Sequence, residues 1–432
     1  PVWKDEAKTI MRHPGLDNHG MGTIFEELIR RFNEENNEEA GEHWTPRDVV
    51  ELMADLVFMP VADQIQDATY SCYDGACGTG GMLTVAQERL LTLAHRRGKD
   101  VSIHLFGQEI NPETYAICTA DMLLKGDGDQ AEHIMYGSTL SDDQHASRRF
   151  DFMLSNPPYG KSWKTDAEKM GGKKDILDTR FNTYLEGGEE MAMIPDVSDG
   201  QILFLLNNIS KMKRDTALGS RIAEVHNESS LFKKNAGSGE SNARRYMFEK
   251  DLVEAIIALP DSMFYNTSLG TYIWILSNKK EGRRKGKVQL IDASQMKEEI
   301  KKKLGDKKYE LTPELRKRIV ELYLAFDEGD RRYSRVFNNE DFGYYHIAVY
   351  RPLRLSVVHT EEGIHSIINE DKQFGELVSR VVQSDSLDYN DVMSRLESAA
   401  KDVNLKLSAK RIKLFRSAMT EVNPLAKPVM AS

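Results

Sequence analysis

The sequence predicts an α/β fold built on a Rossmann-like, doubly wound parallel sheet. Strand-like and helix-like segments alternate between residues 45 and 155, as expected when helices cover both faces of a parallel sheet. A glycine-rich loop follows the strand-like residues 68–72, and the strand-like residues 105–109 end in an acidic side chain ahead of a helix start. Because parallel strands place such loops at one edge of the sheet, we expect a ligand site there.

Ahead of this sheet, residues 24–32 carry apolar side chains at helical spacing, and a polar, acidic connector follows over residues 33–42. We interpret residues 1–40 as the end of an N-terminal helical domain. Because the chain begins at Pro1 without a methionine, we expect that part of this domain is missing from the sequence.

The first loop of the predicted sheet spans residues 73–82 and leads into an amphipathic helix. Its glycines allow a tight turn and a close approach to a ligand. The spacing differs from G-x-G-x-x-G, and the lysine of a phosphate-binding loop is missing, so a pyrophosphate is not predicted. Asp74 at the strand end suits a cationic or hydroxyl-bearing group, such as the methionine part of S-adenosylmethionine. A nucleotide site of another kind is the alternative.

The second strand end presents Glu109, whose carboxylate suits two ribose hydroxyls. A helix is predicted to begin at once, with Asn111 as its N-cap, Pro112 at the first helical position and Gly126 beyond its end. These residues predict a βαβ unit with its ligand at the carboxyl ends of the strands.

The tetrapeptide Asn156-Pro157-Pro158-Tyr159 follows the apolar residues 150–154. The Asn156 amide oxygen and a proline carbonyl can both accept hydrogen bonds from a planar exocyclic amino group. Tyr159 adds a flat ring for stacking. The tetrapeptide therefore indicates a loop that holds an amine for attack on a methyl donor, and the alternative is a turn in which two prolines only end a strand.

Seven segments follow one another in an order that carries a family resemblance: residues 41–47, 74–82, 107–112, 156–160, 261–276, 341–344 and 351–353. The chain resembles the modification (methyltransferase) subunits of type I restriction–modification systems, which are N6-adenine DNA methyltransferases. The match covers most of the chain. It implies a methyltransferase sheet, S-adenosylmethionine as methyl donor, and the gamma order of amino methyltransferase motifs.

The resemblance also implies roles for single residues. The catalytic loop is Asn156, Pro157, Pro158 and Tyr159, with Tyr159 stacked on a flipped adenine and Phe264 covering the other face of the base. Phe264, His43 and Trp44 have core packing as their alternative, and no metal site is implied. The donor-binding residues are Glu42, His43, Trp44, Thr45, Pro46, Asp74, Gly75, Cys77, Gly78, Thr79, Gly80, Gly81 and Glu109.

One position departs from the family pattern. Related chains often carry an acid before the dipeptide Thr-Leu, whereas this chain has Ser138 there. The resemblance therefore assigns no residue to the amine of the donor's adenine.

Further predictions concern the segment after the catalytic loop, the end of the catalytic domain and the C-terminal region. Residues 160–200 are interpreted as a lid or DNA-facing loop, with a disordered insertion as the alternative. Strand-like runs at 252–259 and 272–277 close the sheet, so the catalytic domain is expected over 41–294. Residues 295–432 are predicted to form a mostly helical, partner-binding region. Its expected elements are a helix from Thr312 to Phe326, a strand over 344–350 and amphipathic helices over 392–402 and 409–420.

Composition limits the class of protein. With 432 residues, 40% of them hydrophobic, the chain can bury the cores of two or three domains of roughly 100–200 residues each. Apolar runs are short and the mean hydropathy is −0.51, so neither a membrane span nor a signal peptide is predicted. Cys72, Cys77 and Cys118 lie at no metal-ligand spacing, which fits a cytoplasmic protein.

The net charge of −10 is unfavourable for a protein that holds duplex DNA alone, because phosphate neutralisation normally supplies non-specific affinity. We therefore expect a DNA-specificity subunit as partner. The resemblance adds a second copy of the chain and a restriction (nuclease or translocase) subunit as further candidates. The basic residues 279–287 are interpreted as reaching a DNA backbone, with a solvated hairpin as the alternative.

The predicted function is transfer of a methyl group from S-adenosylmethionine to N6 of adenine in duplex DNA by base flipping, within a type I restriction–modification complex. Three alternatives are a stand-alone N6-adenine DNA methyltransferase, a protein-glutamine N-methyltransferase and a non-enzymatic scaffold.

Overall fold

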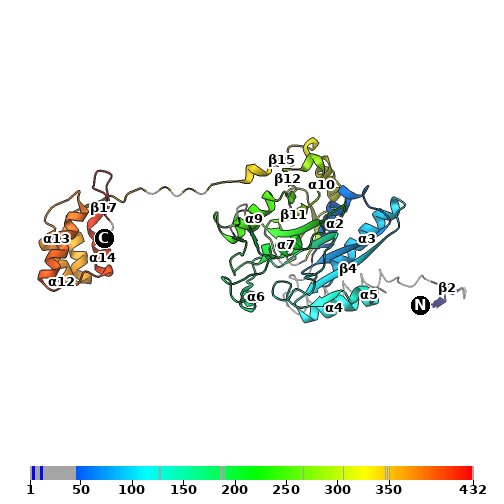
Figure 1. Cartoon of the computed structure of the whole chain (residues 1–432), viewed down its shortest axis with the longest axis horizontal. Coiled ribbons are helices and arrows are strands. Elements are labelled where there is room, and N and C mark those ends of the chain that lie inside the picture. Colours follow the sequence, from blue (N-terminus) through cyan, green and yellow to red (C-terminus); the bar gives the residue numbers. More distant parts are fainter. Residues whose placement is uncertain are drawn as a thin grey trace. The chain divides into compact units, whose positions relative to one another are not determined.

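The computed structural model describes residues 45–125, 128–184, 188, 190–265, 267–304, 306–345, 347, 349 and 351–430. It also describes two short paired strands near the N-terminus, β1 (Val2–Lys4) and β2 (Ile10–Arg12). The chain divides into two compact units, residues 1–346 and 347–432 (Figure 1). The helix expected over residues 24–32 lies outside the described residues.

The first unit is built on one large sheet, which confirms the predicted fold class. Among the described residues it has nine strands in the order β15-β12-β10-β11-β9-β6-β3-β4-β5. Strands β11 and β15 run antiparallel to their neighbours, and the other pairs in the sheet are parallel. The strands are β3 (Ala68–Asp74), β4 (Val101–Glu109), β5 (Ile134–Tyr136), β6 (Phe152–Ser155), β9 (Arg221–Asn227), β10 (Val253–Ala258), β11 (Thr271–Ser277), β12 (Lys287–Asp292) and β15 (Ser334–Asn338).

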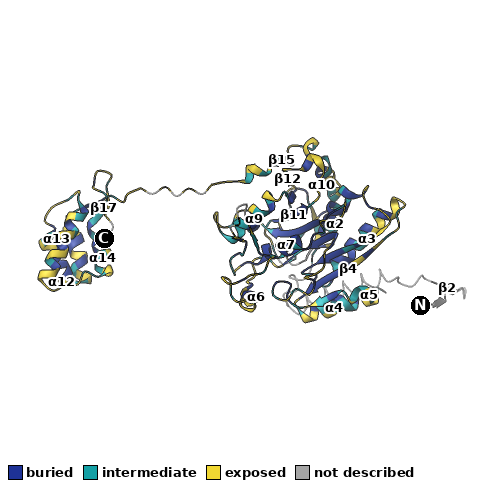
Figure 2. Cartoon of the chain, viewed as in Figure 1, coloured by how far each residue is buried: buried dark blue, intermediate teal, exposed yellow. Residues whose placement is uncertain are grey.

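The central strands are buried on both faces, as parallel strands between two helical layers must be. Successive side chains point to opposite faces, so Cys72 and Leu154 enter one hydrophobic core while Tyr73 and Met153 enter the other. Figure 2 shows these strands as the buried centre of the unit. Because both faces need apolar side chains, the strands read as continuous hydrophobic runs in the sequence.

Helices cover the two faces. Residues of α2 (Arg47–Phe58), α3 (Gly81–Arg96), α4 (Pro112–Leu124) and α10 (Pro313–Ala325) belong to the first core. Residues of α6 (Lys164–Lys169), α7 (Gln201–Ser210) and α9 (Gly239–Glu249) belong to the second. The predicted cap of α4 is confirmed, because the Asn111 side chain accepts from Glu113 N at 2.9 Å and Thr114 N at 3.0 Å.

The first unit extends past the expected end of the catalytic domain at residue 294. Strand β15 pairs with β12, and α10 packs on α2 and β12, so residues 295–345 contribute to the same body. Segment 160–200 contains α6 and the hairpin β7 (Asn182–Tyr184) and β8 (Glu190–Ala192). Its role as a lid or DNA-facing loop stays a prediction.

Two downstream predictions change. Within the basic stretch, Lys280 and Arg284 are buried in ion pairs with Asp251 and Glu254, so neither can face a DNA backbone. Other basic residues of the stretch are exposed, and contact with DNA stays a prediction for them. The strand expected over 344–350 is not formed by those of its residues that the structure describes. Tyr345 is 95% exposed there, and a strand needs a neighbouring strand or a core to pack on.

The second unit is mostly helical, as predicted. It contains α11 (Glu361–Glu370), α12 (Lys372–Val381), α13 (Tyr389–Asp402) and α14 (Ala409–Met419), with β16 (Leu355–Val357) paired to β17 (Thr420–Val422). Ile367, Phe374, Leu396 and Phe415 are fully buried in a core of their own. The unit therefore has the hydrophobic core of an independent domain.

Candidate active site at the carboxyl edge of the sheet

Three of the predicted site segments meet at one edge of the sheet. Strands β3, β4 and β6 are parallel neighbours, with Tyr73 beside Met153 and Asp74 beside Gly107. Their carboxyl ends therefore bring the glycine loop, Glu109 and the Asn156 loop together. The Ser155 hydroxyl donates to Asp74 Oδ1 at 2.6 Å, which joins the first and third segments directly.

The glycine loop is shaped by positions that exclude side chains. Gly80 has φ +81° and precedes α3, and a Cβ there would lie 2.7 Å from the Cys118 sulfur. A Cβ at Gly75 would lie 2.9 Å from the Tyr73 hydroxyl. The positive φ of Gly80 requires glycine there, and a side chain at Gly75 would displace the buried Tyr73 hydroxyl, so the path of the backbone accounts for two of the predicted donor-binding glycines.

Glu109 is held between the glycine loop and the start of α4. Its Oε2 accepts from Gly78 N at 2.9 Å, and its Oε1 accepts from Asn111 N at 2.8 Å. The residue is 7% exposed. A carboxylate has about four acceptor sites, so this one retains capacity for hydroxyl donors such as a ribose diol.

Asp74 is the buried acid of the site, at 2% exposure. Burial raises the pKa of its carboxyl to about 7, against the opposing hydrogen bonds from Ser155 and Ala76. The neighbouring charges of Glu109 and Glu224 raise the pKa further. A cation bound beside Asp74 would compensate this cluster of acids.

The Asn156 loop holds two unsatisfied polar atoms. The Asn156 amide group donates to Thr45 Oγ1 at 3.0 Å, which fixes the side chain. Its Oδ1 and the Tyr159 hydroxyl are both shielded from solvent and have no hydrogen-bond partner among the described residues. Burial raises the pKa of Tyr159 to about 12, so its hydroxyl stays protonated at neutral pH. An unpaired buried acceptor is costly, which favours a ligand that donates to it.

Hydrogen bonds also fix the far side of this loop, through residues that sequence reasoning missed. Gly160 N donates to Asp199 Oδ1 at 3.1 Å, and Gln201 bridges Asp199 Oδ2 at 2.7 Å and Asn227 Oδ1 at 2.9 Å. Asp199 and Gln201 flank the start of α7, and Asn227 ends β9. No local motif marks them, because their partners lie far along the chain.

Other predicted site residues stand as follows. Thr45 contacts Asn156, and Pro46 is the buried residue ahead of α2. Phe264 is 1% exposed and belongs to the core that contains α2 and α10, which favours its packing alternative over stacking on a base. Glu42, His43 and Trp44 lie outside the described residues. The assigned roles of the site residues stay predictions.

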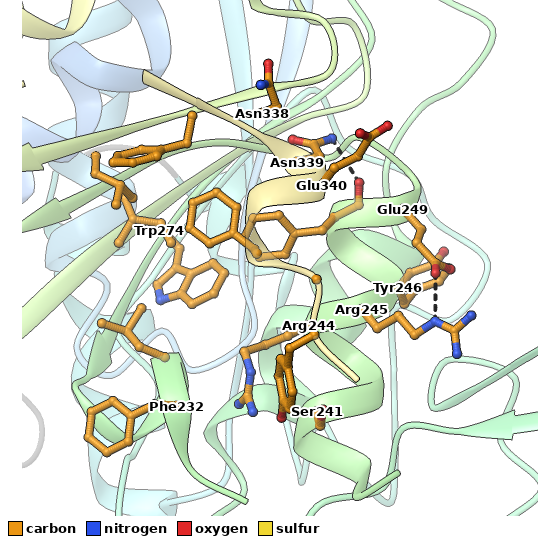
Figure 3. Close-up of a pocket in the computed structure, with 18 of the residues that line it drawn as sticks. Phe232, Ser241, Arg244, Arg245, Tyr246, Glu249, Trp274, Asn338, Asn339 and Glu340 are labelled. Carbon is orange, nitrogen blue, oxygen red and sulfur yellow. Dashed lines mark hydrogen bonds and ion pairs between the residues drawn. The ribbon is translucent and has the colours of Figure 1, made fainter. Parts of the chain in front are cut away.

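A separate cavity of about 2250 Å³ lies over the face of the sheet that carries α9 (Figure 3). Phe232, Arg244, Tyr246 and Trp274 line it, and its lining includes neither Asp74 nor Asn156. Its floor is formed by residues of β10, β11, β12 and β15, in the half of the sheet away from β3 and β4. The cavity is therefore distinct from the site of the three loops.

A parallel sheet with a reversed strand β11, an acid ending β4 and a glycine loop after β3 defines a Rossmann-like methyltransferase domain. Residues 16–345 match the family described as N-6 DNA Methylase, and the chain belongs to this family.

Relatives agree with this assignment. The chain is 28% identical over 312 residues to the type I restriction enzyme MjaIX methylase subunit of Methanocaldococcus jannaschii, covering 72% of this chain and 50% of the relative. It is 25% identical over 392 residues to the MpnII methylase subunit of Mycoplasma pneumoniae, covering 86% and 65%. It resembles the solved type I restriction-modification methyltransferase subunit from Streptococcus thermophilus, with a TM-score of 0.59, 25% identity, and coverage of 77% and 62%.

The chain spans about half the length of the first curated relatives that it matches, 50% and 54% of two of them. Within the part of the chain that the structure describes, no helix is long and apolar enough to cross a membrane. The cytoplasmic location stays a prediction.

Proposed function

We propose that this chain is the methyl-transferring subunit of a type I restriction–modification complex, acting on N6 of adenine in duplex DNA with S-adenosylmethionine as donor. Family membership supports the reaction class. The observation that carries the proposal is the unpaired Asn156 Oδ1, a fixed acceptor on the same sheet edge as Asp74 and Glu109.

The residues present fit the donor. Asp74 and Glu109 offer buried acceptors for cationic and hydroxyl groups, and Gly75 and Gly80 let the loop between the two strands pack closely against Tyr73 and Cys118. When bound, the donor supplies a methyl group on a positively charged sulfur. The carboxylates bind and orient this cation.

On the target side, the Asn156 loop would hold the base. The base must leave the duplex, because its amine cannot meet a methyl donor inside the stack. Asn156 Oδ1 and the Pro157 carbonyl accept from the amine, which orients the nitrogen lone pair. Stacking on Tyr159 offsets part of the lost base stacking, by about 1–3 kcal/mol. When the donor is bound, methyl transfer would form the N–C bond as the S–C bond breaks, and the amine proton would leave to solvent.

The partners are proposed on charge and on family. A net charge of −10 leaves little surplus for binding phosphates, so a specificity subunit would hold the DNA. A second copy of the chain and a restriction subunit complete the proposed assembly. The partner-binding role expected for residues 295–432 is proposed for the second unit, residues 347–432, since 295–345 belong to the first.

The test replaces the acceptor. We expect Asn156→Ala, assembled with the specificity subunit, to lose at least about 100-fold in tritium transfer from labelled donor to DNA, because the amine is no longer positioned. Donor binding, measured by calorimetry, should survive.

Asn156→Asp is the matched control, because it keeps an acceptor oxygen at the same place and should retain part of the activity. Unchanged turnover in Asn156→Ala, or label that appears in protein instead of DNA, would overturn the proposal.

A further inference from the structure

The position that departs from the family pattern has a carboxylate partner from another part of the chain. The hydroxyls of Ser138 and Ser141 both lie 2.6 Å from Oδ1 of Asp166. Asp166 belongs to α6, which follows the Asn156 loop. An acid is therefore present at the end of β5 although the sequence has serine there.

The hydrogen bonds from the two serines involve only one of the two oxygens of the Asp166 carboxylate. Ser138 Oγ accepts from Leu140 N at 3.2 Å and from Ser141 N at 3.4 Å, so its own proton points to Asp166. Two hydroxyl donors thus converge on Oδ1. Among the described residues, Oδ2 of Asp166 has neither a hydrogen bond nor an ion pair, and the residue is partly exposed. Oδ1 of Asp166 therefore already accepts two hydrogen bonds, whereas Oδ2 can accept one from a ligand.

This carboxylate stands beside both donor-holding segments. Gly137 N donates to the Glu109 carbonyl at 3.0 Å, and the Thr139 hydroxyl donates to the Gly75 carbonyl. Ser138 lies between these two anchors and is 7% exposed. Ile110, next to Glu109, is 58% exposed and offers an apolar surface for a flat ring. Because Ile110 directly follows Glu109, a nucleoside bound to Glu109 through its ribose has an exposed apolar side chain one residue away on which its base can pack.

We propose that Asp166 accepts a hydrogen bond from the exocyclic amine of the donor's adenine, and that Ser138 and Ser141 are its positioning residues. This inference rests on the proposed function. An ionised carboxylate accepts but cannot donate, so the site selects a base with an amino group over one with a carbonyl group at that position. The selection is thus made by a residue of α6, outside the segments that carry the family resemblance.

The experiment compares two forms of the reaction product by calorimetry on the full chain: S-adenosylhomocysteine and S-inosylhomocysteine, in which a carbonyl replaces the amine. We expect the unmodified chain to bind the adenine form at least about tenfold more tightly, the value of a hydrogen bond to a charged group. Asp166→Ala should lose this preference by weakening only the adenine form. The paired variant Ser138→Ala with Ser141→Ala should lose part of it.

Glu168→Gln on the same helix is the control, because Glu168 pairs with Lys164 at the surface and should leave the preference unchanged. Thermal melting of each variant reports folding, and the serine pair tests the inference if Asp166→Ala does not fold. A preference that survives in both variants, or equal weakening of both compounds, overturns the role of Asp166 and leaves the proposed function standing. Failure of the unmodified chain to bind either compound overturns both.

Discussion

At residue 74 a carboxylate is buried among other acids. Burial raises the pKa of Asp74 to about 7, and Glu109 and Glu224 add to the effect. The group is therefore largely protonated in the donor-free protein below pH 7 and ionised above it. Because the unfolded chain ionises near the ordinary value of 3.8, Asp74 contributes a stability that is lost as pH rises from about 4 to about 7.

Donor binding should have the opposite pH dependence. A cationic donor favours the ionised carboxylate, so its affinity should rise about tenfold between pH 6 and pH 8 and level off above pH 7, if only the ionised form binds. Calorimetry across this range on the unmodified chain and Asp74→Asn is the measurement. The variant, which cannot titrate there, should bind more weakly and show a flat profile. A flat profile in the unmodified chain would remove Asp74 from the donor site.

At the scale of elements, a buried ionic cluster holds the second half of the sheet. Arg221 of β9 donates to Glu254 of β10 at 3.0 Å and to the Tyr323 hydroxyl of α10 at 2.6 Å. Tyr323 donates to Glu254 at 2.9 Å, and Arg284 lies 3.3 Å from the same carboxylate. All four side chains are at most 3% exposed. The cluster ties α10 to strands on both sides of β11.

Removing the shared acid should destabilise the first unit strongly. Glu254→Ala leaves Arg221 and Arg284 buried without their carboxylate, so the free energy of unfolding should fall by about 3–5 kcal/mol. Tyr323→Phe removes one hydroxyl and should cost about 1–3 kcal/mol. Urea denaturation followed through the first unit's transition is the measurement.

The exposed pair of Arg245 and Glu249, seen in Figure 3, provides the control. Glu249→Ala should change stability by less than about 0.5 kcal/mol. An equal effect of Glu254→Ala and Glu249→Ala would mean that the buried cluster contributes no more than a surface pair.

The elements also show how far sequence reasoning reaches. The cap at Asn111, the glycine loop and the hydrophobic runs of β3, β6 and β11 are local signals, so the fold class and the sheet edge could be predicted. Asp199 and Asp166 act through partners tens of residues away, and no spacing rule marks them. Phe264 shows the converse limit, because an aromatic residue near a strand end fits a core and a stacking site equally well. Its exposure of 1% in the structure is what favours the core.

At the scale of the whole molecule, the charge balance favours the proposal that this chain transfers the methyl group while a partner binds and recognises the DNA. The chain has 58 basic and 68 acidic residues, and two basic residues of its most cationic stretch, Lys280 and Arg284, are used internally. Non-specific DNA affinity depends on lysine and arginine side chains that can reach phosphates. The proposed methyl transfer therefore needs a partner to bring the duplex to the carboxyl edge of the sheet.

This division predicts how DNA binding responds to the partner. The chain alone should bind duplex DNA no more tightly than about 10⁻⁴–10⁻⁶ M at physiological salt, without preference for any sequence. With the specificity subunit, the Kd for the recognised site should fall to about 10⁻⁸–10⁻¹¹ M, because base contacts then add to phosphate contacts. Fluorescence anisotropy with cognate and scrambled duplexes at two salt concentrations measures both. If the chain alone discriminated the cognate duplex, it would be a self-sufficient methyltransferase, and the charge argument for a partner would fail.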